Sequence, residues 1–392
     1  MSTSYLSNVR VLDFSRNLAG PYSTLLLSFL GAEVIQIEDP TRQEVMRRNS
    51  PAQCADLRLN KLSFSIDLTK PESIALVKEL AAISDLVVET FKAGTMARWG
   101  IGFDDLHPIN PKLVMISLSG MGQSGPEADY RAYAQIFGSL GGLAHFTGYQ
   151  GGLPTEQRAS LDQRVGQTLA FAALAGLIHS RRTGEGQYID VSARECLTSE
   201  IGDQLMDYAL NGRDKGAQGN ADVFMAPHNC YPCREEDSWV SIAVASDEEW
   251  RNLCTVIDRF DLVEDDRFRT QLGRWKHQAE LDSEVGEWTR SRTDHEATEI
   301  LQQAGVAAFP VLNAAQIFSD RHLHARDFIR EVEHEEYGRR MVFAPPWRLR
   351  NAEIRSRSPV FGEHNDYVLR TLLGKSPQEV ADLQSHDVLI QQ

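Results

Sequence analysis

Cysteine is scarce in this chain of 392 residues, and long apolar runs are absent. The five cysteines are odd in number and widely spread, which favours a reducing cytoplasm over a disulfide framework. No apolar run approaches the roughly 20 residues that a bilayer-spanning helix needs. Residues 1–10 also lack the basic start and apolar core of a secretory signal. We therefore expect a cytoplasmic protein without a membrane segment.

Basic residues are also fewer than acidic ones. The chain has 40 Lys and Arg against 55 Asp and Glu, a formal net charge of −15. Such a balance argues against affinity for nucleic acid or for an anionic membrane surface. It leaves room for a local basic pocket that holds a small anion. The hydrophobic content of 42% is enough for a large core, and the length predicts two domains.

Two common site motifs are missing or incomplete. Residues 9–38 are typical of a strand, a loop, a helix and a second strand, but the first turn has no G-x-G-x-x-G. A nicotinamide dinucleotide is therefore not the favoured ligand. Cys230 and Cys233 form a CxxC without a second ligand pair at zinc-site spacing. We expect no metal.

The pattern along the chain alternates strands and helices. Short apolar runs predict strands at residues 9–13, 33–38, 64–68, 85–90 and 113–118, with residues 42–60 as a long connection. This alternation predicts an α/β protein with a mostly parallel sheet. Open sheets of this class bind ligands at the carboxyl ends of their strands. The polar residues expected at that edge are Asp13, Glu38, Asp67, Thr90 and Ser119.

The order of elements also predicts the domains. Residues 1–210 and 304–392 are assigned to a large Rossmann-like domain built from N- and C-terminal segments. The polar, glycine-rich residues 211–221 are a linker. Residues 222–303, where the alternation is less regular, are assigned to a smaller α+β domain.

Residues 147–192 contain a glycine-rich turn, an acid, a long apolar helix and a strand. The acid, Asp162, lies where the irregular segment becomes helical, and Thr183-Gly184 ends the helical pattern. One interpretation is a helix cap, in which its oxygen accepts from free backbone N–H groups. Another is a nucleophile, held ionised at the helix end and directed at a carbonyl. Spacing alone favours the cap.

Five segments resemble a known family. They are VLDFSRNLAGPYSTLLLSFLGAEVIQIEDP (11–40), LNKLSFSIDLTKPES (59–73), SDLVVETFKAGTMARWGIGFDDL (84–106), NPKLVMISLSGMGQSGP (110–126) and the block from ASLDQRVG to RRTGEGQYIDVS (159–192). APHNCYPC, AGVAAFPVLN and PVFGEHNDYVLRTLLG add weaker matches. The chain thus resembles the class III CoA-transferases, the family that also holds formyl-CoA transferase, carnitine CoA-transferase and α-methylacyl-CoA racemase.

The resemblance makes Asp162 the catalytic nucleophile, because the family's aspartate opens the helix before the R-TG-GQ-DVS turn. It implies reversible transfer of CoA from an acyl-CoA thioester to a carboxylic acid, through aspartyl-anhydride and aspartyl-CoA intermediates. It also implies an interlocked homodimer. Backbone N–H groups near glycines are candidates to stabilise the oxyanions of this chemistry.

By the same resemblance, coenzyme A is the co-substrate and a set of residues is expected to contact it. These residues are Leu18, Ala19, Ile66, Asp67, Leu68, Thr69, Thr90, Phe91, Lys92, Arg98 and Arg131. The substrate pocket is expected to include Asn17, Tyr133, Gly141 and Gly142.

Some positions depart from the family. Tyr133 stands where the racemases carry a histidine, and a phenol with a pKa of about 10 is a poor proton shuttle at neutral pH. Asp39 replaces a basic residue of formyl-CoA transferases, so oxalate and formate specificity is not inherited. Gln163 and Arg164 stand where small or apolar residues are usual. They shape an acceptor site, or Arg164 lowers the pKa of Asp162.

Three alternatives stay open. The first is that the chain is a racemase or epimerase of 2-methylacyl-CoA, which Tyr133 disfavours. The second is that it is a non-catalytic CoA-binding partner subunit, which the intact Asp162 disfavours. The third is that it is an unrelated nucleotide-binding Rossmann protein, which the missing glycine fingerprint disfavours.

Overall fold

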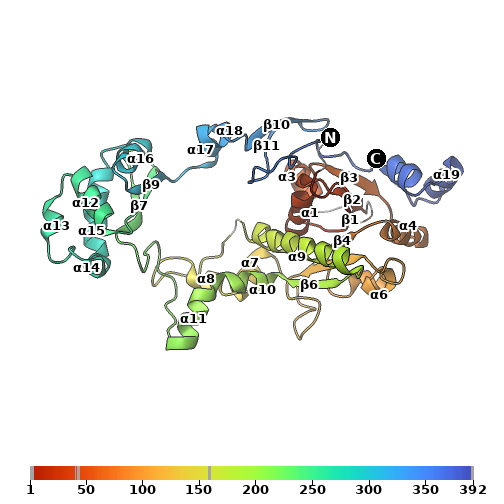
Figure 1. Cartoon of the computed structure of the whole chain (residues 1–392), viewed down its shortest axis with the longest axis horizontal. Helices are drawn as coiled ribbons and strands as arrows, with labels where there is room; N and C mark the ends of the chain where they lie inside the picture. The colour runs from red at the N-terminus through yellow and green to blue at the C-terminus, as the bar shows by residue number, and fades with distance from the viewer. Residues whose placement is uncertain (1–3, 40, 42–44, 158–159, 390–392) are drawn as a thin grey trace. The chain divides into compact units, whose positions relative to one another are not determined.

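The computed structural model describes residues 4–39, 41, 45–157 and 160–389 and divides the chain into two compact units (Figure 1). Unit 1 comprises residues 1–144, 156–213 and 322–392, and unit 2 comprises residues 145–155 and 214–321. None of the helices in the described ranges has the length and apolarity that crossing a membrane requires.

A parallel sheet forms the centre of the described part of unit 1. Its strands are β1 (Arg10–Asp13), β2 (Glu33–Glu38), β3 (Lys61–Ser65), β4 (Leu86–Glu89), β5 (Val114–Ser119) and β6 (Tyr188–Ser192). They pair in the order β3-β2-β1-β4-β5-β6, and each pairing is parallel. This confirms the predicted α/β class with a parallel sheet. The chain reverses its direction of winding between β1 and β4, which makes the carboxyl ends of these two strands a favoured ligand site.

Unit 1 also contains helices. They are α1 (Ala19–Phe29), α2 (Val45–Asn49), α3 (Pro51–Asp56), α4 (Pro71–Ala82), α5 (Thr95–Arg98), α6 (Phe103–Leu106), α7 (Ala134–Leu140), α9 (Leu161–Thr183), α10 (Ala193–Thr198), η2 (Ser199–Ile201), α11 (Gly202–Asn211), a π-helical turn η3 (Tyr367–Leu372) and α19 (Pro377–Ser385). A hairpin of β10 (Ile329–His334) and β11 (Gly338–Phe343) belongs to the same unit. Helices α8 (Leu143–Phe146) and α18 (Arg321–Ala325) cross the division between the units in sequence.

The two faces of the sheet carry different helices. Met115 shares a core with residues of α4, α6 and η3. A side chain on Gly176 of α9 would instead lie 2.8 Å from a methyl group of Val114. Since successive strand residues point to opposite faces, α9 covers the face opposite α4 and α6.

Unit 2 contains an antiparallel sheet of β7 (His228–Pro232), β8 (Trp239–Ala243) and β9 (Ala307–Pro310), paired in that order. Its helices are α12 (Asp247–Val256), α13 (Asp261–Glu264), α14 (Gln271–Lys276), α15 (Gln278–Thr289), α16 (Asp294–Gln303) and α17 (Ala314–Ser319). Because β9 bonds to β8, residues 307–310 complete the sheet of unit 2, whereas the sequence placed residues 304–392 with the large domain. The predicted division into domains stays a prediction.

Two local predictions were wrong. Residues 42–60 were expected to be an irregular connection, yet α2 and α3 form within them. Helices of five and six residues are too short to show an apolar period, although Pro51 at the start of α3 is a typical first-turn residue. The strand expected at 64–68 runs instead from Lys61 to Ser65, because Lys61 is buried and ion-paired.

The pair of Lys61 and Asp13 lies fully buried between β3, β1 and α1. The Lys61 Nζ is 3.0 Å from Asp13 Oδ2 and also donates to the carbonyl of Pro21 and to Thr24 Oγ1. The Ser15 N–H donates to Asp13 Oδ1 at 2.9 Å, and the Thr24 hydroxyl donates to Oδ2 at 2.6 Å. A buried pair with its hydrogen bonds satisfied is costly to break, because removing one member leaves an uncompensated charge. Asp13 therefore fixes the turn that follows β1.

We predict that Asp13→Ala lowers the free energy of unfolding by about 3–5 kcal/mol, because the charge of Lys61 stays buried without its partner. Urea denaturation measures this change. The control is Glu331→Ala, which removes an exposed ion pair with Arg339 on the β10–β11 hairpin and should cost at most about 1 kcal/mol. Equal losses in the two variants would contradict the prediction.

Candidate active site

Asp162 lies in the first turn of α9, with Ser160 rather than Asp162 at the N-cap position. Its carboxyl group is half-buried, and within the described residues no hydrogen bond or ion pair engages it. Burial is the cause that raises the pKa of Asp162 above its usual value. The expected capping bond is therefore not formed. An acid without a partner at a helix N-terminus is available to react.

Helix α9 approaches α1 closely at Gly166, one turn after Asp162. A Cβ on Gly166 would lie 2.6 Å from the carbonyl oxygen of Ala19 and 3.1 Å from the ring of Tyr22. Residues four apart lie on the same side of a helix, so Asp162 and Gly166 share the side of α9 that meets the start of α1. The predicted residues Leu18 and Ala19 belong to that start.

The loop before α1 also contacts the end of β4. The N–H of Arg16 donates to Thr90 Oγ1 at 2.8 Å, and the Arg16 guanidinium lies 5.3 Å from the centre of the Phe91 ring. A Cβ on Gly20 would lie 2.5 Å from Thr90, so only glycine permits this approach. The structure thus joins the segment holding Asn17, Leu18 and Ala19 to the turn holding Thr90 and Phe91, at the reversal point between β1 and β4.

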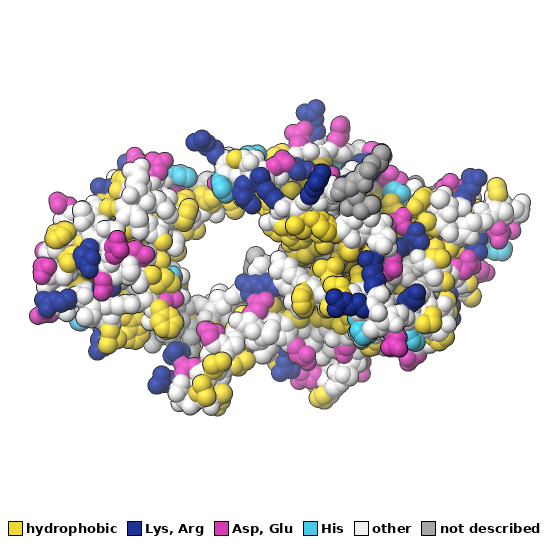
Figure 2. All heavy atoms as spheres, in the orientation of Figure 1, with side chains coloured by type: hydrophobic (Ala, Val, Ile, Leu, Met, Phe, Trp, Pro, Cys, Tyr) yellow, Lys and Arg dark blue, Asp and Glu magenta, His cyan; other side chains and the backbone are white. Residues whose placement is uncertain are grey.

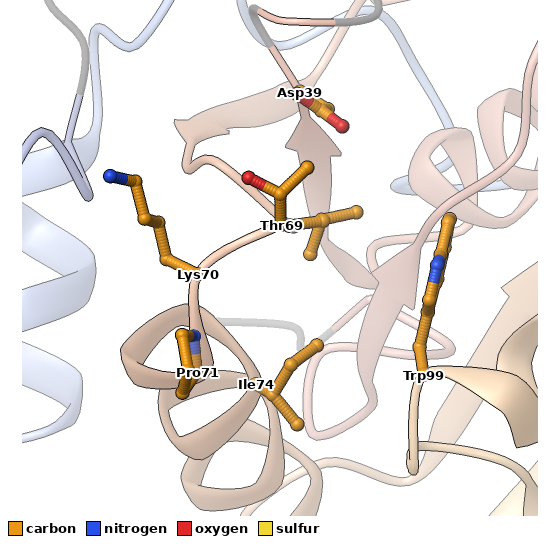
Figure 3. Close-up of a pocket in the computed structure, with 7 residues that line it drawn as sticks. Asp39, Thr69, Lys70, Pro71, Ile74 and Trp99 are labelled. Carbon is orange, nitrogen blue, oxygen red and sulfur yellow. The ribbon is translucent and has the colours of Figure 1, made fainter.

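A cavity of about 380 Å³ lies beside the carboxyl ends of β2 and β3 (Figure 3). Its walls are Asp39, Leu68, Thr69, Lys70, Pro71, Ile74 and Trp99. Figure 3 shows Trp99 across the cavity from Thr69 and Lys70, with Asp39 above Thr69 in this view. The Phe91 and Trp99 rings are 5.1 Å apart, so this cavity adjoins the Thr90–Phe91 turn.

Predicted contact residues near the cavity differ in exposure. Leu68 and Thr69 line it. Asp67 is buried and accepts hydrogen bonds from the N–H and hydroxyl of Thr69, which shapes the turn. The side chain of Ile66 lies in the core, which leaves only its backbone to meet a ligand.

The predicted basic residues Lys92 and Arg98 share an acidic neighbour. Lys92 Nζ lies 2.8 Å from Asp129 Oδ1. The hydrogen bond from Lys92, followed by the charges of Lys92 and Arg98, holds the pKa of Asp129 below its usual value. Arg98 Nη2 also donates to Thr95 Oγ1 at 2.8 Å. Arg131 is exposed. A phosphate would compete with Asp129 for these cations.

Helix α7 connects the predicted pocket residues to α9. Tyr133 precedes α7 and is 75% exposed, and Gly141 ends the helix. A Cβ on Gly138 of α7 would lie 2.8 Å from Leu161, the residue directly before Asp162. Gly142 has φ +95°, a conformation that favours glycine. The structure therefore packs the helix between Tyr133 and Gly141–Gly142 against the start of α9.

Arg164 does not act on Asp162. Its Nη1 lies 2.8 Å from Glu200 Oε2, and the only cause that shifts the pKa of Asp162 is burial, which raises it. Of the two roles considered for Arg164, lowering the pKa of Asp162 is therefore wrong.

One titratable group at this edge is not among the residues that the sequence predicts for the site. Glu89 ends β4 and is buried, and its Oε2 accepts from the N–H of Phe91 at 2.5 Å. Burial raises its pKa to about 7. The available signal was an acid that closes the apolar run LVVE directly before two predicted contact residues.

Within the described ranges, no three His, Cys, Asp or Glu side chains cluster in a way that could hold a metal ion. The five cysteines are free thiols. The expectation that no metal is used stays a prediction.

The sequence model of CoA-transferase family III matches residues 6–365 of the chain. A succinyl-CoA–D-citramalate CoA-transferase of Chloroflexus aurantiacus is 33% identical over 98% of both chains. A succinate–glutarate CoA-transferase of Agrobacterium fabrum is 30% identical over 94% of this chain and 95% of its own. Among solved structures, a CAIB/BAIF family protein from Brucella suis superposes with a TM-score of 0.85 and 28% identity, covering 95% of this chain and 100% of its own.

We predict that Gly166→Ala destabilises the protein by about 1–3 kcal/mol, because the added methyl group overlaps the Ala19 carbonyl and forces α9 away from α1. Chemical denaturation measures the change. Gly202→Ala is the matched control, since a Cβ there meets no atom within 4 Å and alanine favours helix. If both substitutions were tolerated equally, the close approach would not constrain α9.

Proposed function

The chain belongs to CoA-transferase family III, and we propose that it transfers CoA reversibly from an acyl-CoA thioester to a carboxylic acid with Asp162 as the nucleophile. The observation that carries this proposal is the half-buried carboxyl group of Asp162, unengaged by the described residues and on the side of α9 that meets the start of α1. A raised pKa also makes this carboxylate more basic, and hence a better nucleophile once it is ionised.

In the proposed first half-reaction, a carboxylate oxygen of Asp162 attacks the thioester carbonyl. The C–S bond breaks, which gives a mixed anhydride and CoA thiolate. The thiolate then attacks the aspartyl carbonyl and releases the donor acid, which leaves an aspartyl-CoA thioester. The acceptor carboxylate then attacks the aspartyl-CoA carbonyl and expels CoA thiolate, which gives a second mixed anhydride. The thiolate attacks the acceptor carbonyl of this anhydride and expels the carboxylate of Asp162. Overall one thioester replaces another of similar energy, so no ATP is consumed.

Each of these attacks forms a tetrahedral oxyanion. The N–H groups of Gly141 and Gly142 already donate to the carbonyls of Phe137 and Ser139, so we propose this turn, with Asn17 and Tyr133, as lining of the substrate pocket rather than as the source of the oxyanion donors. Support comes from the packing of α7 against Leu161 and from the positive φ of Gly142, which exposes backbone without a side chain.

For coenzyme A, the proposed binding surface runs along the carboxyl edge of the sheet. The cavity beside Trp99 offers apolar walls of a size suited to a ring system, and Lys92 and Arg98 offer cations for phosphate. The turn that holds Thr90 and Phe91 adjoins the cavity through the contact between the Phe91 and Trp99 rings. The same turn is bonded to Arg16, in the loop that leads to Leu18 and Ala19.

We propose dicarboxylic acids as the acceptor class. The names of the two relatives with 33% and 30% identity pair succinyl-CoA with D-citramalate, and succinate with glutarate, and each of these acids carries two carboxyl groups. Racemisation is disfavoured because Tyr133 presents an exposed phenol in place of an imidazole.

We predict that Asp162→Ala abolishes CoA transfer while CoA still binds, because the substitution removes the attacking carboxylate and leaves the sheet edge intact. Activity assays and calorimetry measure the two properties. In the unaltered protein, hydroxylamine added during turnover should convert Asp162 to a hydroxamate that peptide mass spectrometry detects. Transfer that continues with Asp162 unmodified would defeat the mechanism. Glu248→Ala, which removes an exposed acid in the first turn of α12, is the matched control and should keep full activity.

An interlocked homodimer is part of the proposal. Support comes from α11, which buries none of its residues against the described part of the chain and exposes Leu205, Met206, Tyr208 and Leu210. Space-filling Figure 2 shows hydrophobic side chains gathered on this helix. An apolar stripe of this kind is typical of an interface.

We predict that sedimentation equilibrium gives twice the mass of one chain at micromolar concentration. The double substitution Met206→Asp and Leu210→Asp should weaken association, because it places charges in the apolar stripe. The exposed change Leu153→Asp in unit 2 is the control. A monomer at all concentrations would contradict the dimer. The cytoplasmic location stays a prediction.

A further inference from the structure

Glu89 occupies an unusual place for an acid. It ends the apolar strand β4 and is only 3% exposed. In the strand register, Glu89 faces Ser117 of β5, and Ser117 in turn faces Asp190 of β6. Residues that face each other in register point to the same side of a sheet, so two acids flank one hydroxyl group.

The carboxylate of Glu89 holds the turn that follows it. Its Oε2 accepts from the N–H of Phe91 at 2.5 Å, and Ser117 supplies a further hydrogen bond. The Phe91 ring is packed edge-on against Trp99 and lies beneath the guanidinium of Arg16. By holding the Phe91 N–H, the Glu89 carboxylate therefore sets the positions of Thr90 and Phe91 relative to the loop before α1 and to the cavity beside Trp99.

The same surroundings disfavour a charge. Burial is the largest cause that raises the pKa of Glu89, to about 7, and the charge of Asp190 raises it further. The hydrogen bonds from Ser117 and from the Phe91 N–H act in the opposite direction. The other titratable group facing it is Tyr188 of β6, whose own pKa is raised by burial. A neutral residue of the same shape at this position would make the folded protein more stable.

We propose that Glu89 is a positioning residue for acyl-CoA, whose carboxylate orients the Thr90–Phe91 turn through the Phe91 N–H. The inference rests on the proposed function, because that turn is where CoA is expected to bind. Glu89 does not touch the reacting atoms and acts through the backbone it holds. The stability lost by burying an acid is tolerated at functional sites where it secures a geometry.

The pH dependence has a definite sign. Folding raises the pKa from 4.5 to about 7, so between these values the folded protein binds more protons than the unfolded chain. Stability from this group is therefore greatest at acid pH and falls as pH rises through that window. The hydrogen bond to Phe91 changes in the other direction, because an ionised acceptor bonds more strongly than a neutral one.

The test is Glu89→Gln, which keeps the shape and an acceptor oxygen but removes the charge. At pH 8 we expect the KM for acyl-CoA to rise about fivefold to tenfold, with kcat within about twofold, because one charge-assisted hydrogen bond is weakened. The melting temperature should rise above that of the unaltered protein at pH 8, and the gap should narrow toward pH 5. In the unaltered protein, KM should increase as pH falls from 8 to 6, and in the variant it should change less.

Controls separate this role from others. Glu33→Gln lies at the amino end of β2, where Glu33 bonds to Arg10 and Tyr367, and should leave KM unchanged. The phosphomonoester of CoA also titrates near pH 6, but it does so equally with both proteins, so only the difference between their profiles counts. A Gln variant with a higher melting temperature and an unchanged KM would make Glu89 structural only. Absence of transfer by the unaltered protein would overturn the proposed function instead, while CoA affinity, measured by calorimetry, would still test Glu89.

Discussion

Helix α9 can lie against the start of α1 only because residue 166 has no side chain. The carbonyl oxygen of Ala19 occupies the space that a Cβ would need. At the other end of the contact, Gly176 admits α9 to the sheet beside Val114. Two glycines thus allow α9 to approach α1 and the sheet closely, and the first turn of this helix carries Asp162. The candidate site depends on this backbone approach more than on any single polar contact.

The buried acids of unit 1 fall into two groups, which differ in their partners and in their pKa values. Asp13 is fully paired, by Lys61 and by hydroxyl and amide donors, and it secures the turn after β1. Asp162 and Glu89 are buried to different degrees, and the pKa of each is raised. The paired acid stabilises the scaffold. The two acids with raised pKa values, Asp162 and Glu89, both belong to the proposed site.

Much of the scaffold could be predicted because it depends on local pattern. Strand β2 has the bounds that its apolar run indicates, and the parallel sheet follows from the alternation of elements. What escaped prediction depends on distant neighbours. Lys61 begins a buried strand only because Asp13 lies beside it, and the pKa of Glu89 depends on Ser117 and Asp190 from two other strands. The cavity beside Trp99 is also lined by residues from segments that are far apart in the sequence. The helical pattern after Asp162 placed this residue at the start of a helix. The ion pair between Arg164 and Glu200 could not be predicted, because the two residues are distant in the sequence.

The central claim is that an oxygen atom of Asp162 exchanges with the substrate acids during turnover. In the proposed mechanism, the acceptor acid attacks aspartyl-CoA, and one of its oxygens becomes the bridging oxygen of a mixed anhydride. The CoA thiolate then attacks the acceptor carbonyl and breaks its bond to this oxygen, which stays on the aspartate. The protein should therefore be incubated with acyl-CoA and an acceptor acid labelled with oxygen-18, and the peptide containing Asp162 analysed by mass spectrometry. We expect oxygen-18 in the carboxyl group of Asp162, in an amount that increases with turnover. Complete transfer of CoA with no label at Asp162 would contradict it.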